Sequence, residues 1–411
     1  MNNVNNTKLQ LASLSIFRKI MNRTVPKAFY RLLCSLDDKP CDFLNAYGEF
    51  FSLISERGCS HSLAYSLTEA ALFDENIFTR AAAGGRYKEL PPEVLAAVKR
   101  DCEAVLAAAN LKAEEVLKSY AYYSVISDVV DSLPRWECGE CAESFKMFDG
   151  SLDVVAQWYR ENGCGMFARY EAFAWRDGDI QPVAHNDRIR LEDFTGYERQ
   201  RGKIVENTEA FLNGKSCNNC LLFGDMGTGK SSTVKAIANN YRKDGLRIVQ
   251  IPKERLMEFP LLVDKIATLP MKFIIFIDDL SFQSQDQSYT TLKAVLEGGL
   301  SARPDNALIY ATSNRRHIVK ERLSDRSFES DDVNTRDNMQ ETLSLSDRFG
   351  LAVCYTVPDK KEYISIVCAL AEKRGLKLSR EELAAGAERF ALSRGGRSPR
   401  CAKQYVESLF C

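Results

Sequence analysis

Residues 224–231 match the pattern G-x-x-x-x-G-K-[ST], and this octapeptide restricts the possible folds more than any other feature of the chain. An apolar run over residues 220–223 leads into it and predicts a buried strand, and residues 231–243 follow it with a helical pattern. A loop of this kind needs such a context, because it joins a strand to a helix whose N-terminus faces a phosphate group. The alternative interpretation, a glycine turn without a ligand, would not need it.

The residues of this loop have separate chemical tasks. Its glycines permit a tight turn in which backbone N–H groups point inward around a polyphosphate. Lys230 brings a positive charge to the β and γ phosphates, and the hydroxyl group of Ser231 is placed to bind Mg²⁺. We therefore expect a nucleoside triphosphate to bind at Gly224, Asp225, Met226, Gly227, Thr228, Gly229, Lys230, Ser231 and Ser232.

The chain has 411 residues, more than one hydrophobic core usually organises, so we expect about two or three domains. Apolar residues at 45% and charged residues at 27% suit soluble globular domains, and no apolar stretch is long enough to cross a bilayer. A formal net charge of −1 gives no overall attraction to nucleic acid or acidic lipid. The N-terminus lacks the features of a secretory signal. We expect a cytoplasmic protein without a membrane partner.

The 13 cysteines form an odd set without regular spacing, which suits reduced thiols better than a disulfide framework. Two C-x-x-C pairs, 138/141 and 217/220, could together form a four-thiolate zinc site. The second pair runs into the strand before the phosphate loop, where alternate side chains face opposite ways, and the first pair has no third ligand nearby. The histidines make no metal or nucleophile pattern and are interpreted as structural: His61, His185 and His317.

Residues 1–190 are expected to form a mostly helical N-terminal domain. Residues 41–56 and 92–119 repeat apolar positions at intervals of three and four, which predicts helices. Residues 166–183 instead suggest a short β-hairpin around Asp177 and Gly178. No catalytic pattern occurs here, so the role of this domain stays open between a substrate adaptor, an oligomerisation module and a regulatory domain.

After a boundary near residue 190, the sequence alternates predicted strands and helices. Strands are expected at 220–223, 247–251, 273–277 and 307–312, and helices at 231–243, 254–267 and 288–300. This alternation predicts an α/β fold with a parallel sheet covered by helices on both faces and a ligand at the carboxyl ends of its strands. The tail from residue 360 predicts a small helical bundle. The expected domains are therefore 1–190, 191–358 and 359–411.

Two acidic residues follow the apolar strand at 272–277. An apolar strand that ends in paired carboxylates suggests a cation or another charge that holds them. We interpret Asp278 as the Mg²⁺ partner and Asp279 as the group that polarises the attacking water. The alternative is a solvated strand end followed by a helix cap.

The motifs after the phosphate loop resemble those of the AAA+ superfamily. Asn314, at the end of the next strand, matches a sensor residue that contacts the γ phosphate and orients water in that superfamily. Residues 344–350 resemble the segment that delivers an arginine to the nucleotide of a neighbouring subunit, which makes Arg348 the candidate finger. The alternative for Arg348 is a surface ion pair.

The C-terminal motif Gly-Gly-Arg-Ser-Pro-Arg at 395–400 is similar to the second AAA+ sensor, which reports nucleotide to a helical lid. Proline before Arg400 fits a helix start, so Arg400 is the first candidate and Arg397 the competitor. Both could instead be plain surface arginines. Residues 191–198 resemble the segment that packs beside adenine. The resemblance covers residues 191–411 and is closest to a bacterial family of AAA+ ATPases filed as a domain of unknown function.

Three departures from the superfamily qualify this resemblance. Many AAA+ enzymes end the acidic strand in Asp-Glu, whereas this chain has Asp278 and Asp279, as replication initiators and some loaders do. Residues 252–259 lack the aromatic-apolar-glycine pore loop of protein unfoldases. The connection at 315–345 is long and rich in charged residues and serine, which suggests a mobile or partner-binding insertion.

The resemblance implies an ATPase that binds ATP and Mg²⁺ between the subunits of a homo-oligomer, whose assembly nucleotide could promote. The alternative is a nucleotide-gated loader or scaffold that hydrolyses ATP slowly or not at all. A small-molecule kinase fits less well, because it would not need Asn314, Arg348 and a helical lid in this order. The client, a protein or a nucleic acid, stays open.

Overall fold

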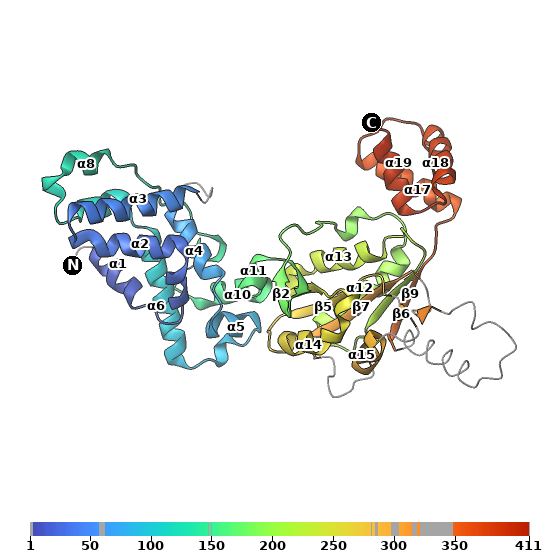
Figure 1. The fold of residues 1–411 in the computed structure, drawn as a ribbon, viewed down its shortest axis with the longest axis horizontal. Coiled ribbons are helices and arrows are strands. Elements are labelled where there is room, and N and C mark those ends of the chain that lie inside the picture. Colours follow the sequence, from blue (N-terminus) through green and yellow to red (C-terminus); the bar gives the residue numbers. More distant parts are fainter. Residues whose placement is uncertain are drawn as a thin grey trace. The chain divides into compact units, whose positions relative to one another are not determined.

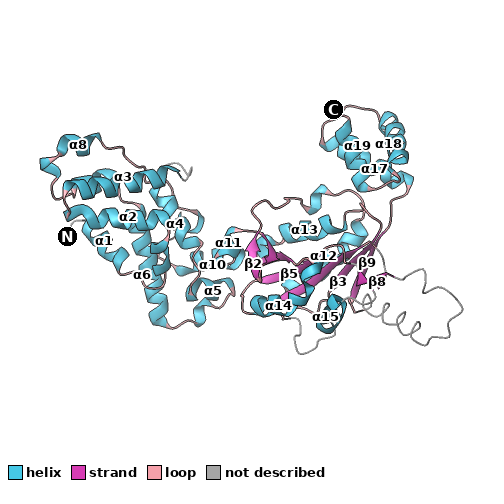
Figure 2. Ribbon diagram, viewed as in Figure 1, coloured by secondary structure: helices cyan, strands magenta, loops and turns pink. Residues whose placement is uncertain are grey.

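The computed structural model describes residues 3–56, 62–146, 148, 150–280, 282–283, 287–296, 304–314, 319–320 and 348–410. The chain divides into two compact units, Met1–Arg169 and Tyr170–Cys411. Figures 1 and 2 show helices throughout the first unit and a sheet with covering helices in the second. The predicted α/β fold class is therefore confirmed: a mostly parallel sheet covered by helices, with a helical bundle after it and a helical unit before it.

The first unit is built from helices packed around aromatic side chains. The ring of Trp136 lies 5.1 Å from the ring of Phe50 and 6.1 Å from that of Phe29, measured between centroids. Its α-helices are α1 (Asn3–Ala12), α2 (Thr24–Cys34), α3 (Pro40–Glu56), α4 (Leu63–Leu72), α5 (Ile77–Ala83), α6 (Pro92–Ala109), α7 (Ala113–Lys118), α8 (Ser127–Ser132), α9 (Glu143–Lys146), α10 (Leu152–Asn162) and α11 (Met166–Arg169).

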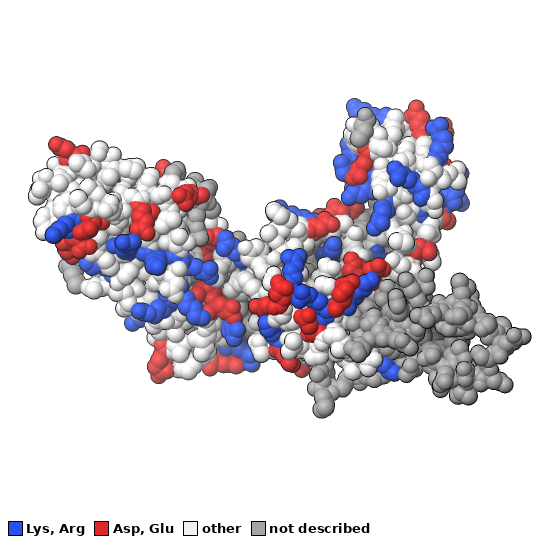
Figure 3. All heavy atoms as spheres, viewed as in Figure 1, with Lys and Arg blue, Asp and Glu red and all other residues white. Residues whose placement is uncertain are grey.

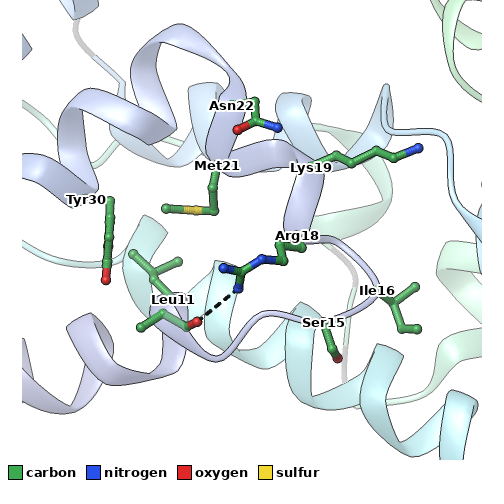
Figure 4. A pocket seen from close by; sticks show the side chains of 9 residues that line it. Leu11, Ser15, Ile16, Arg18, Lys19, Met21, Asn22 and Tyr30 are labelled. Carbon is green, nitrogen blue, oxygen red and sulfur yellow. Dashed lines mark hydrogen bonds between the residues drawn. The ribbon is translucent and has the colours of Figure 1, made fainter.

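The loop after α1 is held by a buried carboxylate. Asp101, on α6, accepts backbone N–H groups from Ser15, Ile16 and Phe17 at 2.9, 2.7 and 3.1 Å. Beside this loop lies a pocket of about 470 Å³, and Figure 4 shows Arg18 among the residues that line it. The Arg18 Nη1 atom donates to the carbonyl oxygen of Ala12 at 3.3 Å. The carboxylate thus fixes one wall of this pocket.

The second unit contains a seven-stranded sheet in the order β2-β1-β4-β5-β7-β3-β9. All neighbouring strands are parallel except β1 and β2. The strands are β1 (Ala172–Arg176), β2 (Asp179–Pro182), β3 (Cys220–Gly224), β4 (Leu246–Gln250), β5 (Lys272–Ile277), β7 (Ala307–Ser313) and β9 (Leu351–Tyr355). A separate parallel pair joins β6 (Phe282–Gln283) to β8 (Val319–Lys320).

Helices cover both faces of this sheet. Figure 1 shows α12 (Glu198–Leu212) and α13 (Lys230–Asn240) on one face and α14 (Phe259–Ala267) and α15 (Gln287–Leu296) on the other. Every residue of β7 is buried, as a strand covered on both faces requires. The helix predicted over 254–267 is shorter in the structure: a 3₁₀ turn, Lys253–Glu258, precedes α14, whose first turn contains a proline.

The predicted hairpin is present, but it belongs to the sheet. Asp177 and Gly178 both have positive φ angles, 51° and 72°, as a two-residue turn between twisted strands requires. Strand β1 then pairs in parallel with β4, so the second unit begins at Tyr170 rather than near residue 190. Periodicity along the chain does not reveal such a pairing, because the two strands are far apart in sequence.

The chain ends in three helices, here called the lid: α17 (Lys360–Lys373), α18 (Arg380–Arg394) and α19 (Pro399–Ser408). They share a core that includes Tyr363, Leu383 and Tyr405. Each helix begins at a side-chain cap, supplied by Asp359, Ser379 and Ser398 respectively.

Candidate functional site

The loop between β3 and α13 depends on its glycines. Gly224, Gly227 and Gly229 have φ angles of 125°, 76° and 91°, a region that L-residues rarely adopt. A Cβ atom on Gly224 would also lie 2.2 Å from the carbonyl oxygen of Tyr355 on β9. The loop conformation is therefore reserved for glycine at these positions.

The N-terminus of α13 opens into this loop. Gly229 is the N-cap and supplies no side chain to the first-turn N–H groups of the helix. Such amides, together with the positive end of the helix dipole, form an anion-binding site. The loop and the helix end thus fit the phosphate groups of a nucleotide.

Lys230 folds back into the loop. Its Nζ atom donates to the carbonyl oxygens of Gly224 at 2.9 Å and Asp225 at 2.7 Å, and its side chain is almost fully buried. Burial lowers the pKa of Lys230, while the nearby carboxylates of Asp225, Asp279 and Asp278 oppose this shift. Three acidic neighbours therefore help to keep the ammonium group charged.

Ser231 and Asp278 meet where β5 ends. The Ser231 Oγ atom donates to Asp278 Oδ1 at 2.6 Å, and Thr312 Oγ1 on β7 donates to the same oxygen, also at 2.6 Å. The structure therefore brings together the two residues predicted to bind the metal.

Asp279 and Asn314 are also in contact. Asn314 Nδ2 donates to Asp279 Oδ1 at 2.7 Å, and Asn314 Oδ1 accepts from Lys230 Nζ at 3.2 Å. Asp279 has a positive φ of 53°, which is uncommon for a residue other than glycine. Its N–H donates to Thr312 Oγ1 at 2.9 Å. The tips of β3, β5 and β7 are thereby joined in one hydrogen-bond network.

The donor set at this network fits Mg²⁺. It combines the hydroxyl group of Ser231 with the carboxylate of Asp278, and Mg²⁺ is commonly bound through one or two carboxylates, waters and substrate phosphates. In the part of the chain that the structure describes, no three His, Cys, Asp or Glu residues gather into a group that could hold a metal alone. The described members of the C-x-x-C pairs are free thiols, and the zinc alternative gains no support.

The two candidate arginines of the lid have different partners. Figure 3 shows many Lys and Arg side chains on the drawn face of the lid, so a positive charge alone does not indicate which of the two arginines would bind nucleotide. Arg400 donates its backbone N–H to the carbonyl of Gly227 at 3.1 Å, which places it beside the loop. Arg397 instead binds Glu388 and lowers the pKa of that carboxyl group.

A pocket of about 380 Å³ lies between the loop and the lid. Met226 and Gly227 line it from the loop, and Arg394, Arg397, Arg400 and Gln404 line it from the lid. Asp225 links the same loop to the start of the lid, because its Oδ2 atom accepts the N–H of Val357 at 2.7 Å. A ligand in the loop would therefore touch the residues that connect the sheet to the lid.

The segment predicted to pack beside adenine also reaches the loop. The ring of Phe194 lies 3.7 Å from where a Cβ atom of Gly229 would be. Tyr197 stacks on Tyr355 at 5.2 Å between ring centroids, and its hydroxyl group donates to the carbonyl of Thr356 at 2.6 Å. Aromatic side chains thus border the loop on the side of the lid linker.

Arg348 lies just before β9, at the amino ends of the strands, whereas the phosphate loop lies at their carboxyl ends. The first residue of β9, Leu351, pairs with Cys220 at the start of β3, whereas Tyr355 pairs with Gly224 at the loop. The length of β9, about 13 Å at 3.3 Å per residue, separates these two levels, so Arg348 does not join the loop network of its own chain. The residues before it in the predicted finger segment, 344–347, lie outside the described residues.

Thr312 and Tyr355 also contact the candidate site residues, and the sequence analysis did not single them out. Thr312 binds both acidic residues, and the Tyr355 carbonyl accepts the N–H of Asp225 at 2.8 Å. The sequence did carry one signal for Thr312: it lies two positions before Asn314, and alternate residues of a strand point to the same face, so its hydroxyl group was expected on the side of Asn314.

Comparison with known proteins gives a family and a distant likeness. The sequence profile of a family described as "Protein of unknown function (DUF815)" matches residues 168–411, more than half of the chain. No curated protein matches the chain. Of the helices that the structure describes, none combines the length and apolar character that a membrane crossing would need.

Among solved structures, the chain is similar to the RuvB Holliday junction branch migration motor of Thermotoga maritima, with 16% identity and a TM-score of 0.36. A mutant of that protein gives 15% identity and a TM-score of 0.37. In both comparisons the match covers 53% of this chain and 63% of that chain. The chain thus spans less than two thirds of the length of these structures.

Proposed function

The chain belongs to the family described as "Protein of unknown function (DUF815)", and we propose that it is an ATPase of the AAA+ type, which binds ATP with Mg²⁺ and hydrolyses it at a site shared between subunits. One observation carries this proposal: the network in which Asn314 joins Lys230 to Asp279 while Ser231 joins Asp278. It places a cation, two acids and an amide around one phosphate loop, the groups that phosphoryl transfer to water uses.

Each residue then has a task. The amides of the loop and Lys230 bind and orient the phosphates. Bound Mg²⁺ would neutralise charge on the β and γ phosphates, held by Ser231 and Asp278. Asp279 accepts a hydrogen bond from the attacking water and then its proton. Asn314 bonds both the carboxylate of Asp279 and the ammonium group of Lys230 and so fixes their relative position.

The position of Arg348 supports a shared site. An arginine at the amino ends of the strands, away from its own loop, cannot stabilise charge there, but it can do so at the loop of a neighbouring copy. We therefore propose a homo-oligomer in which Arg348 completes the site of the next subunit. The cysteines of the two C-x-x-C pairs are free thiols, which suits a reducing compartment, and we place the protein in the cytoplasm.

The environment of Asp279 favours a second function, a nucleotide-gated loader or scaffold with slow hydrolysis. The Asp279 carboxylate is already bound by Asn314 and sits on a backbone of positive φ, and aspartate reaches less far than glutamate. These features would slow the activation of water without weakening nucleotide binding. The two functions differ in turnover, not in the location of the site.

The test is steady-state hydrolysis and nucleotide binding by the wild type, Lys230→Ala and Arg348→Ala, with Arg389→Ala on the exposed surface of α18 as the matched control. We expect Lys230→Ala to lose binding and Arg348→Ala to bind but turn over at least about a thousandfold more slowly. Mixing the two variants should restore activity, because about a quarter of random interfaces then contain both intact residues.

Full activity of Arg348→Ala beside an inactive Lys230→Ala would contradict the shared site. Binding without measurable turnover in the wild type would favour the loader. Calorimetry that detects no binding of adenine nucleotides by the folded wild type would refute both.

A further inference from the structure

Thr312 is the residue of β7 that fastens the acidic end of β5. It is 2% exposed and is the next-to-last residue of its strand. Its hydroxyl group donates to Asp278 Oδ1 at 2.6 Å and accepts the N–H of Asp279 at 2.9 Å, and its carbonyl accepts the N–H of Leu280 at 2.7 Å. Three consecutive residues after β5 therefore depend on one residue of the adjacent strand.

The two bonds of the hydroxyl group fix its direction. Because the N–H of Asp279 occupies a lone pair of Thr312 Oγ1, the hydroxyl proton is available to Asp278. Asp278 Oδ1 also accepts the Ser231 hydroxyl proton at 2.6 Å, so both lone pairs of this oxygen are used. Oδ2 is then the oxygen of Asp278 left for a metal ion or a metal-bound water.

The same bond holds the backbone at Asp279. A φ of 53° places this residue in a conformation that few aspartates adopt, and its N–H is anchored to Thr312 while its carboxylate is anchored to Asn314. Rotation of this backbone would move the carboxylate away from the position in which it faces the loop. Thr312 thus controls the orientation of one acid directly and of the other through the main chain.

We propose that Thr312 is a positioning residue for the metal and water side of the site, and that its hydroxyl group couples Mg²⁺ to nucleotide binding. This inference rests on the proposed function. Partners behind metal ligands of this kind typically contribute about tenfold to hundredfold in metal affinity or activity.

Thr208 on α12 is the control for Thr312, because its buried hydroxyl group has only a structural role. Thr208 is fully buried, and its hydroxyl group bonds the carbonyl of Ile204 and the hydroxyl group of Tyr310, both at 2.7 Å. Thr208→Val removes a buried hydroxyl group of equal size that does not contact Asp278 or Asp279. It therefore reports what the loss of a buried hydroxyl group does to stability alone.

The experiment measures the dissociation constant of a fluorescent ADP with Mg²⁺ and with EDTA, together with the hydrolysis rate. In the wild type Mg²⁺ should tighten binding. Thr312→Val should reduce this tightening by about tenfold or more, with the EDTA value within about twofold of the wild type. Thr312→Ser, which keeps the hydroxyl group, should retain the tightening, and Thr208→Val should leave it unchanged even if its melting temperature falls.

A Thr312→Val variant with the wild-type response to Mg²⁺ would overturn the inference, as would a Thr312→Ser variant as impaired as Thr312→Val. If Thr312→Val does not fold, Thr312→Cys, with a weaker donor of similar size, decides the matter by the same criterion. A different result would refute the proposed function itself: a wild type that binds nucleotide neither with Mg²⁺ nor with EDTA. That result would refute the inference about Thr312 as well.

Discussion

Arg397 and Glu388 form an ion pair with two hydrogen bonds inside the lid, at 2.8 Å from Nε to Oε1 and 2.7 Å from Nη2 to Oε2. Arg400, three residues later, is instead placed beside Gly227 of the phosphate loop. The sequence left these two arginines as competitors, and their contacts give them different expected roles. Arg400 is positioned to respond to nucleotide, and Arg397 to hold α18 to the start of α19.

Arg400→Ala should weaken nucleotide binding or slow turnover by about tenfold, since a charged group near the phosphates is lost. Arg397→Ala should leave nucleotide affinity unchanged and lower the melting temperature only slightly, because a partly exposed ion pair contributes little to folding stability. Nucleotide titration and thermal unfolding of both variants measure the two effects. A loss of nucleotide affinity in Arg397→Ala alone would reverse the assignment.

Gly224→Ala should prevent stable folding of the second unit. Its Cβ atom would lie 2.2 Å from the Tyr355 carbonyl, a backbone atom that cannot move without separating β3 from β9, and φ is 125°. Gly214→Ala is the control, because it also has a positive φ, 67°, but meets no atom within 4 Å, and it should cost only about 1–2 kcal/mol. Denaturant unfolding separates the two. Equal losses would mean that φ alone, not the contact with β9, governs Gly224.

Much of the second unit could be predicted because its signals are local. The loop pattern, the apolar strand before Asp278 and the strand ending at Asn314 each identify a strand end, and parallel strands bring such ends to one edge of a sheet. The close approach of Lys230, Asp279 and Asn314 follows from this rule. Local signals sufficed there.

Other features depend on contacts between distant segments, and the sequence did not reveal them. The pairing of β1 with β4 needs the open edge of β4, and the different partners of Arg397 and Arg400 depend on how the lid packs. Thr312 has the pattern of an ordinary buried strand residue until Asp278 is placed opposite it. Tertiary packing decides these features, and at most the two-residue spacing of Thr312 and Asn314 along β7 hinted at one of them.

Asp279→Asn should separate binding from hydrolysis. The amide keeps an oxygen that can accept from Asn314 Nδ2, so the loop should stay intact and nucleotide affinity should change by less than about threefold. Turnover should fall by about a hundredfold to ten-thousandfold, since a general base is lost. Asp264→Asn, at an exposed position on α14, is the control for removing one negative charge. Wild-type turnover in Asp279→Asn would show that another group activates the water.

Nucleotide affinity should fall at alkaline pH through the titration of Lys230. Burial lowers the pKa of Lys230 in the folded protein below its ordinary value of about 10.4. Bound phosphates favour the charged amine, so above this lowered pKa binding must take up a proton and affinity decreases as pH rises; below it affinity is independent of pH. The same shift means that the unfolded chain holds more protons between the two pKa values, so the nucleotide-free protein becomes more stable as pH rises through that interval.

Calorimetric titration with ADP from pH 7 to about pH 10, in two buffers of different ionisation enthalpy, counts the protons taken up on binding. Lys230→Arg is the matched variant, because its guanidinium group stays charged throughout this range, and its affinity, even if lower overall, should not vary with pH. Proton release by the wild type, or an equal pH dependence in Lys230→Arg, would assign the titration to another group. Uptake that is present in the wild type and absent in Lys230→Arg would place the ammonium group of Lys230 against the phosphates, where its bonds to Gly224 and Asp225 already hold it in the loop.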